Sequence, residues 1–232
     1  LHLHQTHVQF VGKELADRLA ALRPEIRDDV AFIFSIGGYH SLTRTLKYSI
    51  TGEFLLDGQL HRLIPNSYGK WVFVLSNLDF LNRQTDRLAL RRIAYRRMKN
   101  PEADISDLEP ILSTEGKAVL DYITEPDARS IDRRYAALPA PIRQHIEALN
   151  LVNKDLEHLQ APVLLIHGYD DTIVPYAESV SLARALPPDK VELFLIQGLE
   201  HVDSMLQTLK QLWQYWRASY ALLTLRDSLE DD

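Results

Sequence analysis

The sequence predicts an α/β fold, a mostly parallel sheet with helices on both faces, interrupted by a helical insertion. Short runs of β-forming apolar residues lie at 30–34, 163–166 and 191–196. Helical apolar patterns follow the last two of these runs, at 177–186 and 204–225. Strands that alternate with helices are typical of parallel sheets, because each crossover helix packs back onto a face of the sheet.

The first sixty residues supply the first part of this core. Residues 13–22 place their leucines on one stripe, which predicts a helix that Pro24 ends. Residues 30–34 form a continuous apolar run between Asp28-Asp29 and Gly37-Gly38. Such a run predicts a strand buried on both faces, as in a parallel sheet.

Residues 61–150 differ in character from the rest of the chain. They contain many arginines, scattered prolines and short helical patterns, with residues 71–75 ambiguous between strand and helix. We therefore predict a helical cap insertion over 61–150. In the arginine-rich helix expected at 83–99, the residues available to face inward are Leu88, Ala94, Tyr95 and Met98. Its arginines fit a solvated face paired with nearby acidic residues, or an anion-binding surface.

The α/β alternation resumes at Pro162. Strands are expected at 163–166 and 191–196, with a helix over 177–186 that Pro187-Pro188 closes. A long amphipathic helix is expected over 204–225. Residues 151–232 are therefore the second part of the core that residues 1–60 begin.

Composition and charge bound the classes of function. The 232 residues are 46% hydrophobic and 25% charged, which fits one globular domain, and the net charge of −6 gives nucleic-acid binding no support. There is no apolar run that could cross a bilayer and no leader pattern, so we expect a cytoplasmic protein. Cysteine is absent, which excludes disulfides and thiol chemistry.

The strongest motif is Leu-Ile-His-Gly-Tyr-Asp-Asp-Thr-Ile-Val-Pro at 165–175, followed by Gln-Gly-Leu-Glu-His at 197–201. It resembles the α/β-hydrolase superfamily, whose members end a strand in His-Gly-x-x-Asp-x-x-Val-Pro and place the catalytic histidine after the next strand. The resemblance implies that Asp171 is the acid and His201 the base of a Ser-His-Asp triad. Asp171 is preferred to Asp170 because the family places its acid four residues before the proline.

The chemistry explains why these residue types occur together. A serine hydroxyl is a weak nucleophile until an imidazole takes its proton, and the imidazole needs a carboxylate that fixes its tautomer. The 30 residues between Asp171 and His201 correspond to about one strand–helix–strand excursion. Such an excursion returns the chain to the same edge of a parallel sheet.

Ser35 is the predicted nucleophile. The segment Phe34-Ser35-Ile36-Gly37-Gly38 resembles the second half of the family's Gly-x-Ser-x-Gly elbow, and the N–H of Ile36 would then be an oxyanion-hole donor. Ile33 stands where the first glycine should be, and the chain has no complete Gly-x-Ser-x-Gly.

A second register places the elbow earlier in the chain. The segment Val8-Gln9-Phe10-Val11-Gly12-Lys13-Glu14-Leu15-Ala16 would contain a strand followed by Gly12, with Glu14 in the nucleophile position. Residues 30–35 would then be the next strand and Ser35 an ordinary strand-end residue. The sequence leaves both registers open.

The predicted function is hydrolysis of a carboxylic ester through an acyl-enzyme on Ser35, His201 and Asp171. No cofactor and no metal are expected, since the cluster of His2, His4 and His7 has no carboxylate motif beside it. The alternative is a catalytically impaired α/β-hydrolase-like fragment that acts as a binding or assembly module.

The expected partners are a small-molecule ester and a second copy of the chain. Only 34 residues precede Ser35, too few for the strands that family members have before the elbow. We therefore expect an unpaired sheet edge that a homo-oligomer covers. Because the sequence opens with Leu1 and no methionine, we also expect further residues upstream.

Overall fold

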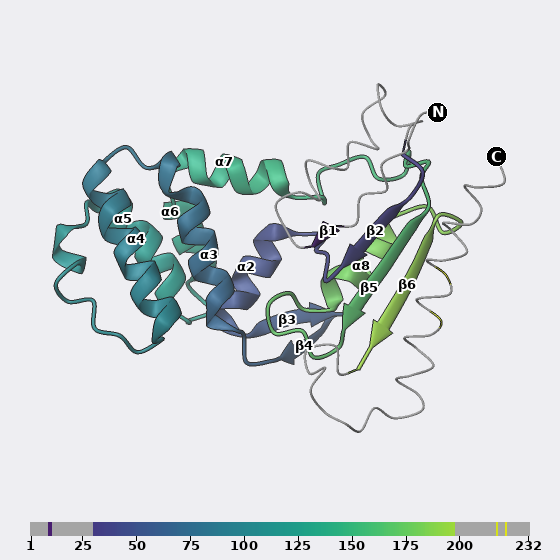
Figure 1. The fold of residues 1–232 in the computed structure, drawn as a ribbon, viewed down its shortest axis with the longest axis horizontal. Coiled ribbons are helices and arrows are strands. Elements are labelled where there is room, and N and C mark those ends of the chain that lie inside the picture. Colours follow the sequence, from purple (N-terminus) through teal and green to yellow (C-terminus); the bar gives the residue numbers. More distant parts are fainter. Residues whose placement is uncertain (1–8, 11–29, 198–216, 218–220, 222–232) are drawn as a thin grey trace. The chain divides into compact units, whose positions relative to one another are not determined.

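The computed structural model describes residues 9–10, 30–197, 217 and 221 (Figure 1). The described residues divide into two compact units, with the boundaries between Ser41 and Leu42 and between Ala148 and Leu149. We call the unit outside these boundaries the sheet unit, and residues Leu42–Ala148 the helical unit. The helical unit begins before residue 61, where the sequence pattern first changes.

The sheet unit contains four parallel strands in the order β1-β2-β5-β6. They are β1 (Gln9–Phe10), β2 (Ile33–Ile36), β5 (Val163–Gly168) and β6 (Val191–Ile196). The predicted strands at 163–166 and 191–196 are therefore confirmed. The strand predicted at 30–34 is displaced to 33–36, because its ladder with β5 starts where the N–H of Ile33 donates to the carbonyl of Pro162.

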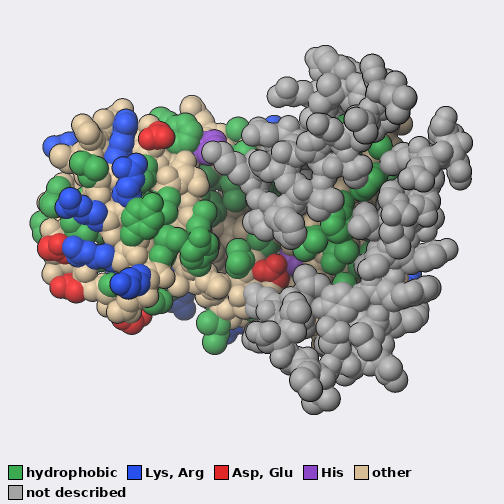
Figure 2. All heavy atoms as spheres, viewed as in Figure 1, with side chains coloured by type: hydrophobic (Ala, Val, Ile, Leu, Met, Phe, Trp, Pro, Cys, Tyr) green, Lys and Arg blue, Asp and Glu red, His purple; other side chains and the backbone are tan. Residues whose placement is uncertain are grey.

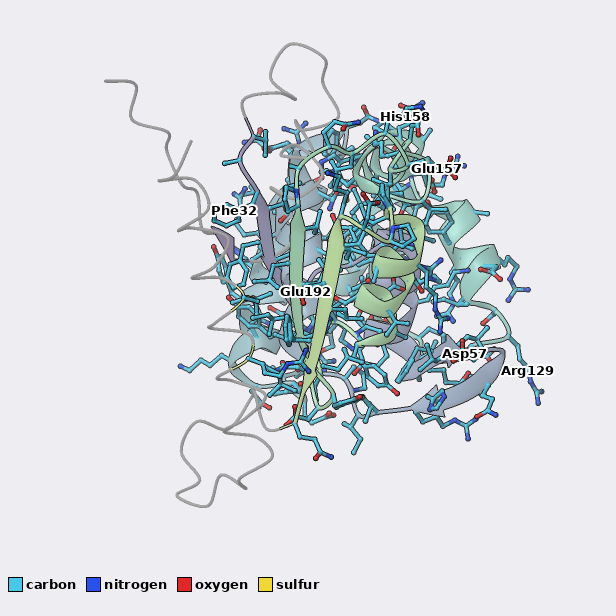
Figure 3. All side chains as sticks on the ribbon, turned by 90° about the vertical axis from the view of Figure 1, so that its right-hand side faces the viewer. Phe32, Asp57, Arg129, Glu157, His158 and Glu192 are labelled. Atoms are coloured by element: carbon cyan, nitrogen blue, oxygen red, sulfur yellow. The ribbon has the colours of Figure 1, made fainter. Side chains whose placement is uncertain are left out.

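Alternating residues of the strands pack on opposite faces of the sheet. On one face, Val163 and Leu165 pack with Leu182 of α8 (Ala177–Ala185), which confirms the helix predicted at 177–186. Figure 3 shows α8 lying along this face. On the other face, Leu164, Phe194 and Ile196 pack with Phe34, Ile166 and Ala221. The predicted α/β class with a parallel sheet is confirmed, whereas the helices predicted at 13–22 and, apart from Arg217 and Ala221, at 204–225 lie outside the described residues.

The helical unit contains six α-helices, two 3-10 turns and one hairpin among its described residues. In chain order these are α2 (Leu42–Thr51), β3 (Glu53–Leu56), β4 (Gln59–Arg62), α3 (Ser67–Asn77), η3 (Leu78–Phe80), α4 (Gln84–Lys99), η4 (Glu109–Ile111), α5 (Thr114–Thr124), α6 (Ile131–Ala137) and α7 (Ala140–Leu149). Residues 71–75, ambiguous in the sequence, are helical. Their apolar side chains Trp71 and Val74 enter the same core as Leu90, Ile93 and Ile123.

The inward face of α4 differs from the prediction. Leu88 and Tyr95, expected to face inward, are 47% and 59% exposed, whereas Leu90 and Ile93 are fully buried. The buried stripe of α4 therefore consists of residues three and four positions apart around Leu90, which pack against α3 and α5. The prediction that Leu88 and Tyr95 face inward was wrong.

Basic side chains gather on the surface of the helical unit (Figure 2). The guanidinium of Arg96 on α4 binds both carboxylate oxygens of Asp107, with Nη2 2.8 Å from Oδ2. This contact agrees with a solvated helix face that pairs with nearby acids. An anionic partner for the other arginines of α4 stays a hypothesis.

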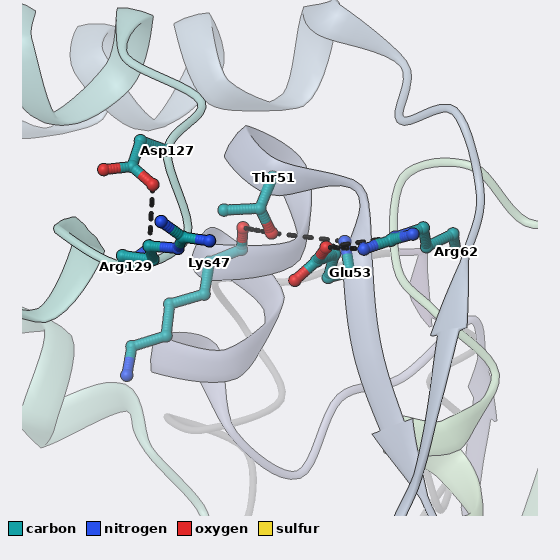
Figure 4. A network of polar contacts seen from close by, with 6 residues as sticks. All are labelled: Lys47, Thr51, Glu53, Arg62, Asp127 and Arg129. Atoms are coloured by element: carbon teal, nitrogen blue, oxygen red, sulfur yellow. Dashed lines mark hydrogen bonds and ion pairs between the residues drawn. The ribbon is translucent and has the colours of Figure 1, made fainter.

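The β3–β4 hairpin closes through a tight turn with left-handed backbone at Asp57 (φ 53°) and Gly58 (φ 74°). Across its open end, Arg62 Nη2 lies 2.7 Å from Glu53 Oε1 (Figure 4). The N–H of Glu53 donates to the hydroxyl of Thr51, which itself donates to the carbonyl of Lys47 in the last turn of α2. These contacts fix the hairpin to the end of α2.

Candidate active site

Asp171 lies in the turn that follows β5, at the carboxyl end of the parallel sheet. Its Oδ1 accepts hydrogen bonds from the backbone N–H of Ile173 (2.8 Å) and of Val174 (3.0 Å). The Asp171 side chain is 23% exposed. The carboxylate is therefore oriented by its own loop and keeps one partly open side.

The ring of His167 lies beside the carboxylate of Asp171 and is fully buried. Its Nε2 lies 3.4 Å from Oδ2 of Asp171 and 2.9 Å from the carbonyl oxygen of Val174. Burial by itself would raise the pKa of the Asp171 carboxyl. The attraction of the nearby His167 ring N–H and the hydrogen bonds from the N–H of Val174 and Ile173 outweigh it, so this pKa lies below its ordinary value.

The turn after β2 passes directly against Asp171. Gly37 has a left-handed backbone (φ 62°), and a Cβ built on it would lie 3.2 Å from Oδ2 of Asp171. The N–H of Gly37 donates to the carbonyl of Ile166 on β5 (2.9 Å). Gly37, predicted as an elbow glycine, thus stands where its lack of a side chain makes room for the acid.

Ser35 lies inside β2, where its Cα is paired with Gln9 of β1 on one side and Leu165 of β5 on the other. It is 6% exposed. Asp57 is the one non-glycine residue with positive φ in the described part of the chain, so Ser35 has ordinary strand backbone. Ile36, the predicted oxyanion donor, ends the strand and is paired with Phe10 and Ile166.

The order of the strands bears on which elbow register applies. An elbow serine sits on a strained turn from a strand to a helix, whereas Ser35 is a paired residue within a strand. The second register requires a strand before Gly12, followed in the chain by the strand of Ser35, and β1 (Gln9–Phe10) lies before Gly12 and pairs with β2. This arrangement favours the second register, and the role of Ser35 as nucleophile stays a prediction.

His201 and Glu14 lie outside the described residues. The topology still restricts where the chain leaves the sheet towards His201. β6 is parallel to β5, and its last residue, Ile196, is paired with Gly168. Asp171 follows Gly168 by three residues and His201 follows Ile196 by five, so both segments start at the same edge.

Sequence reasoning did not assign roles to three buried polar residues of the sheet unit. His167 belongs to the recognised motif, and Ser179 and Glu178 stand in the first turn of α8. The carboxylate of Glu178 accepts the backbone N–H of His40 (3.2 Å) and Ser41 (2.7 Å). For Ser179 and Glu178, the signal in the sequence was a polar residue in the first turn of the helix that follows the Asp171 loop. Polar residues are common in the first turn of helices, so this signal predicted no role.

The part of the chain that the structure describes contains neither a candidate metal centre nor a candidate membrane span. Within the ranges that the structure describes, no group of three or more His, Cys, Asp and Glu side chains is arranged to hold a metal ion. No helix in that part of the chain is long and apolar enough to cross a membrane. The cytoplasmic location stays a prediction.

Comparison with known proteins places one segment in a family. Residues 134–203 match the Hydrolase_4 family model, described as serine aminopeptidase, S33. No curated protein and no solved structure gives a significant match to the chain. The matched segment includes β5, Asp171, α8 and β6, and ends just after His201. Together with the parallel sheet, this match shows that the chain contains part of an α/β-hydrolase domain.

Proposed function

We propose that this chain is a carboxylic ester hydrolase of the α/β-hydrolase type, in which Asp171 orients His201. The observation that supports this best is the Asp171 carboxylate. It is held by two backbone N–H groups at the carboxyl edge of the sheet, and its pKa is lowered, so it is ionised at neutral pH. A fixed, ionised carboxylate is what a catalytic histidine needs on its second nitrogen.

The proposed reaction follows the general course of serine hydrolases. His201 takes the proton of the serine hydroxyl while the serine oxygen bonds to the ester carbonyl carbon. The C–O bond to the alcohol then breaks, and the alcohol leaves with the proton from His201. Water then gives a proton to His201 as its oxygen bonds to the acyl carbon. The ester bond to the serine oxygen breaks, the carboxylic acid is released, and His201 returns the proton to the serine. In the first register Ser35 is this serine and the N–H of Ile36 stabilises the oxyanion, and no cofactor takes part.

A second candidate function is binding without turnover. The observation in its favour is the position of Ser35, which is paired on both sides within β2 and only 6% exposed. In the second register the nucleophile position holds Glu14, a residue that lacks the serine hydroxyl. The chain would then keep the acid and histidine positions but form no acyl-enzyme.

Labelling with a fluorophosphonate probe, followed by peptide mass spectrometry, distinguishes the two functions. An ester hydrolase of the proposed type acquires one adduct that disappears in His201→Ala, and its short-chain ester hydrolysis disappears in Ser35→Ala. Ser49→Ala is the matched control, because Ser49 is equally exposed (6%) but belongs to α2. Absence of any adduct in the folded wild-type chain contradicts the hydrolase and supports binding. An adduct on another serine retains the hydrolase and excludes Ser35.

We also propose a homo-oligomer. The strands that end the order of the described sheet are β1 and β6, and strand edges can pair with another copy of the chain. Sedimentation velocity at micromolar concentration should therefore show a species larger than one chain. Sedimentation of a single-chain species alone contradicts the proposal.

A further inference from the structure

His167 is a fully buried titratable residue that takes no part in the proposed reaction. Both nitrogens of its ring have polar neighbours. Nε2 lies 2.9 Å from the carbonyl oxygen of Val174 and 3.4 Å from Oδ2 of Asp171, and Nδ1 lies 2.6 Å from the hydroxyl of Ser179. An apolar side chain would fill the same place without requiring any hydrogen bond, so the contacts need an explanation.

The neighbours of Nε2 fix its proton. A backbone carbonyl and a carboxylate oxygen can only accept hydrogen bonds, so Nε2 must carry hydrogen. The bond at 2.9 Å goes to Val174, and the longer approach at 3.4 Å is an attraction towards Asp171. One N–H therefore holds both ends of the loop that runs from Asp171 to Val174.

Ser179 fixes the opposite edge of the ring. Its hydroxyl lies 2.6 Å from Nδ1 of His167 and 3.0 Å from the carbonyl oxygen of Gly38, and the residue is 1% exposed. Gly38 follows Gly37, on which a Cβ would lie 3.2 Å from Oδ2 of Asp171. Ser179 thus connects the ring to the same turn that bounds the carboxylate.

We propose that His167 and Ser179 are positioning residues that hold the Asp171 carboxylate towards the base of the triad. The proposal rests on the proposed function, because Asp171 needs positioning only if it serves a histidine. Three segments meet in this contact: the end of β5, the first turn of α8 and the turn after β2. With its Oδ1 bonded to the loop N–H groups and Oδ2 confined between His167 and Gly37, the carboxylate has one remaining open side.

The test compares His167→Phe with His167→Gln by NMR titration of the Asp171 side-chain carboxyl carbon. Phenylalanine retains an aromatic ring but donates no hydrogen bond, so the pKa of Asp171 should rise relative to the wild type. Glutamine can place an amide N–H near the position of Nε2, and the pKa should stay lowered. Ser179→Ala should raise it less than His167→Phe, with Ser49→Ala as the unaffected control. An unchanged Asp171 pKa in a folded His167→Phe overturns the proposal.

Stability and activity complete the test. If His167→Phe does not fold, Ser179→Ala decides, because it removes one hydroxyl and leaves the ring in place; an unchanged Asp171 pKa then overturns the proposal.

In a chain that hydrolyses esters, we expect kcat to fall roughly ten- to hundredfold in His167→Phe with little change in KM. The acidic limb of its pH–rate profile should move to higher pH, and His167→Gln should restore it. The titration needs no turnover, so a wild-type chain that hydrolyses nothing contradicts the proposed function and leaves the positioning result readable.

Discussion

Gly37 and Asp171 are neighbours in space although 134 positions separate them in the sequence: a Cβ added to Gly37 would lie 3.2 Å from Oδ2 of Asp171. The turn after β2 therefore lies against the loop after β5. Because Gly37 also has a positive φ of 62°, a side chain there is strained by its own backbone and by the carboxylate.

Gly37→Ala should therefore destabilise the sheet unit by about 1–3 kcal/mol. Gly58→Ala is the control, because Gly58 has a similar φ of 74° but no atom within 4 Å of its would-be Cβ. Hydrogen–deuterium exchange of peptides that cover 163–185 should quicken in Gly37→Ala and not in Gly58→Ala. Equal protection of these peptides in both variants would show that the proximity of Asp171 adds nothing to the destabilisation caused by a side chain at Gly37.

The lowered pKa of Asp171 predicts how stability depends on pH. A carboxyl whose pKa is lower in the folded chain adds stability above its unfolded pKa of about 3.9, and this stability is lost as pH falls through the folded pKa. Asp171→Asn removes this contribution and places an amide N–H near the N–H of His167. The variant should melt below the wild type at pH 7.

The difference in melting temperature between wild type and Asp171→Asn should shrink below about pH 4. Asp155→Asn is the control on the same unit, since its side chain is 68% exposed and pairs with the exposed ring of His158. A difference that stays constant from pH 7 to pH 3 would mean that the charge of Asp171 does not stabilise the fold.

Glu178 should stabilise the chain segment that leads into α2, and its substitution should lower the free energy of unfolding. Its carboxylate is buried and accepts two backbone N–H groups, from His40 and Ser41. Glu178→Ala leaves both donors without this acceptor, and we expect a loss of about 2–4 kcal/mol. Glu178→Gln keeps one acceptor oxygen and should lose less. Thermal unfolding measures both variants, and equal melting temperatures for the two would contradict the role of the hydrogen bonds.

Asp86 should stabilise the helical unit in the same way as Glu178 stabilises the sheet unit, as a buried carboxylate that accepts hydrogen bonds. It is fully buried in the first turn of α4 and accepts the N–H of Ser113 (2.8 Å) and the hydroxyl of the same residue, just before α5. Asp86→Ala should cost about 2–4 kcal/mol, because it removes a buried, charged acceptor from the partly buried N–H and hydroxyl of Ser113.

Asp107→Ala is the control for Asp86, since it removes an exposed carboxylate that also contacts α4, through Arg96. Exposed ion pairs are weak because water solvates both charges, so this loss should be smaller. Chemical denaturation followed by tryptophan fluorescence, to which the buried Trp71 of the helical unit contributes, reports on both variants. A loss in Asp107→Ala that equals the loss in Asp86→Ala would contradict this account of Asp86.

The sequence by itself determined the elements whose signals are local. β5, α8 and β6 were predicted nearly to their ends, because continuous apolar runs, helical periodicity and the prolines at 162 and 187–188 all act within a few residues. The motif at 165–175 also predicted an α/β-hydrolase domain, in agreement with the family match, and the role of Asp171 as the acid stays a prediction.

Only the tertiary structure decided features that depend on partners far along the chain. The environment of Ser35 depended on which strands flank β2, and the inward face of α4 depended on where α3 and α5 pack. In the sequence, His167 was one residue of the motif with no role of its own. The structure shows that its two ring nitrogens lie beside the Ser179 hydroxyl and the Val174 carbonyl. Local sequence fixes backbone conformation, but burial and hydrogen-bond partners arise from contacts between segments distant in the chain, which no local pattern records.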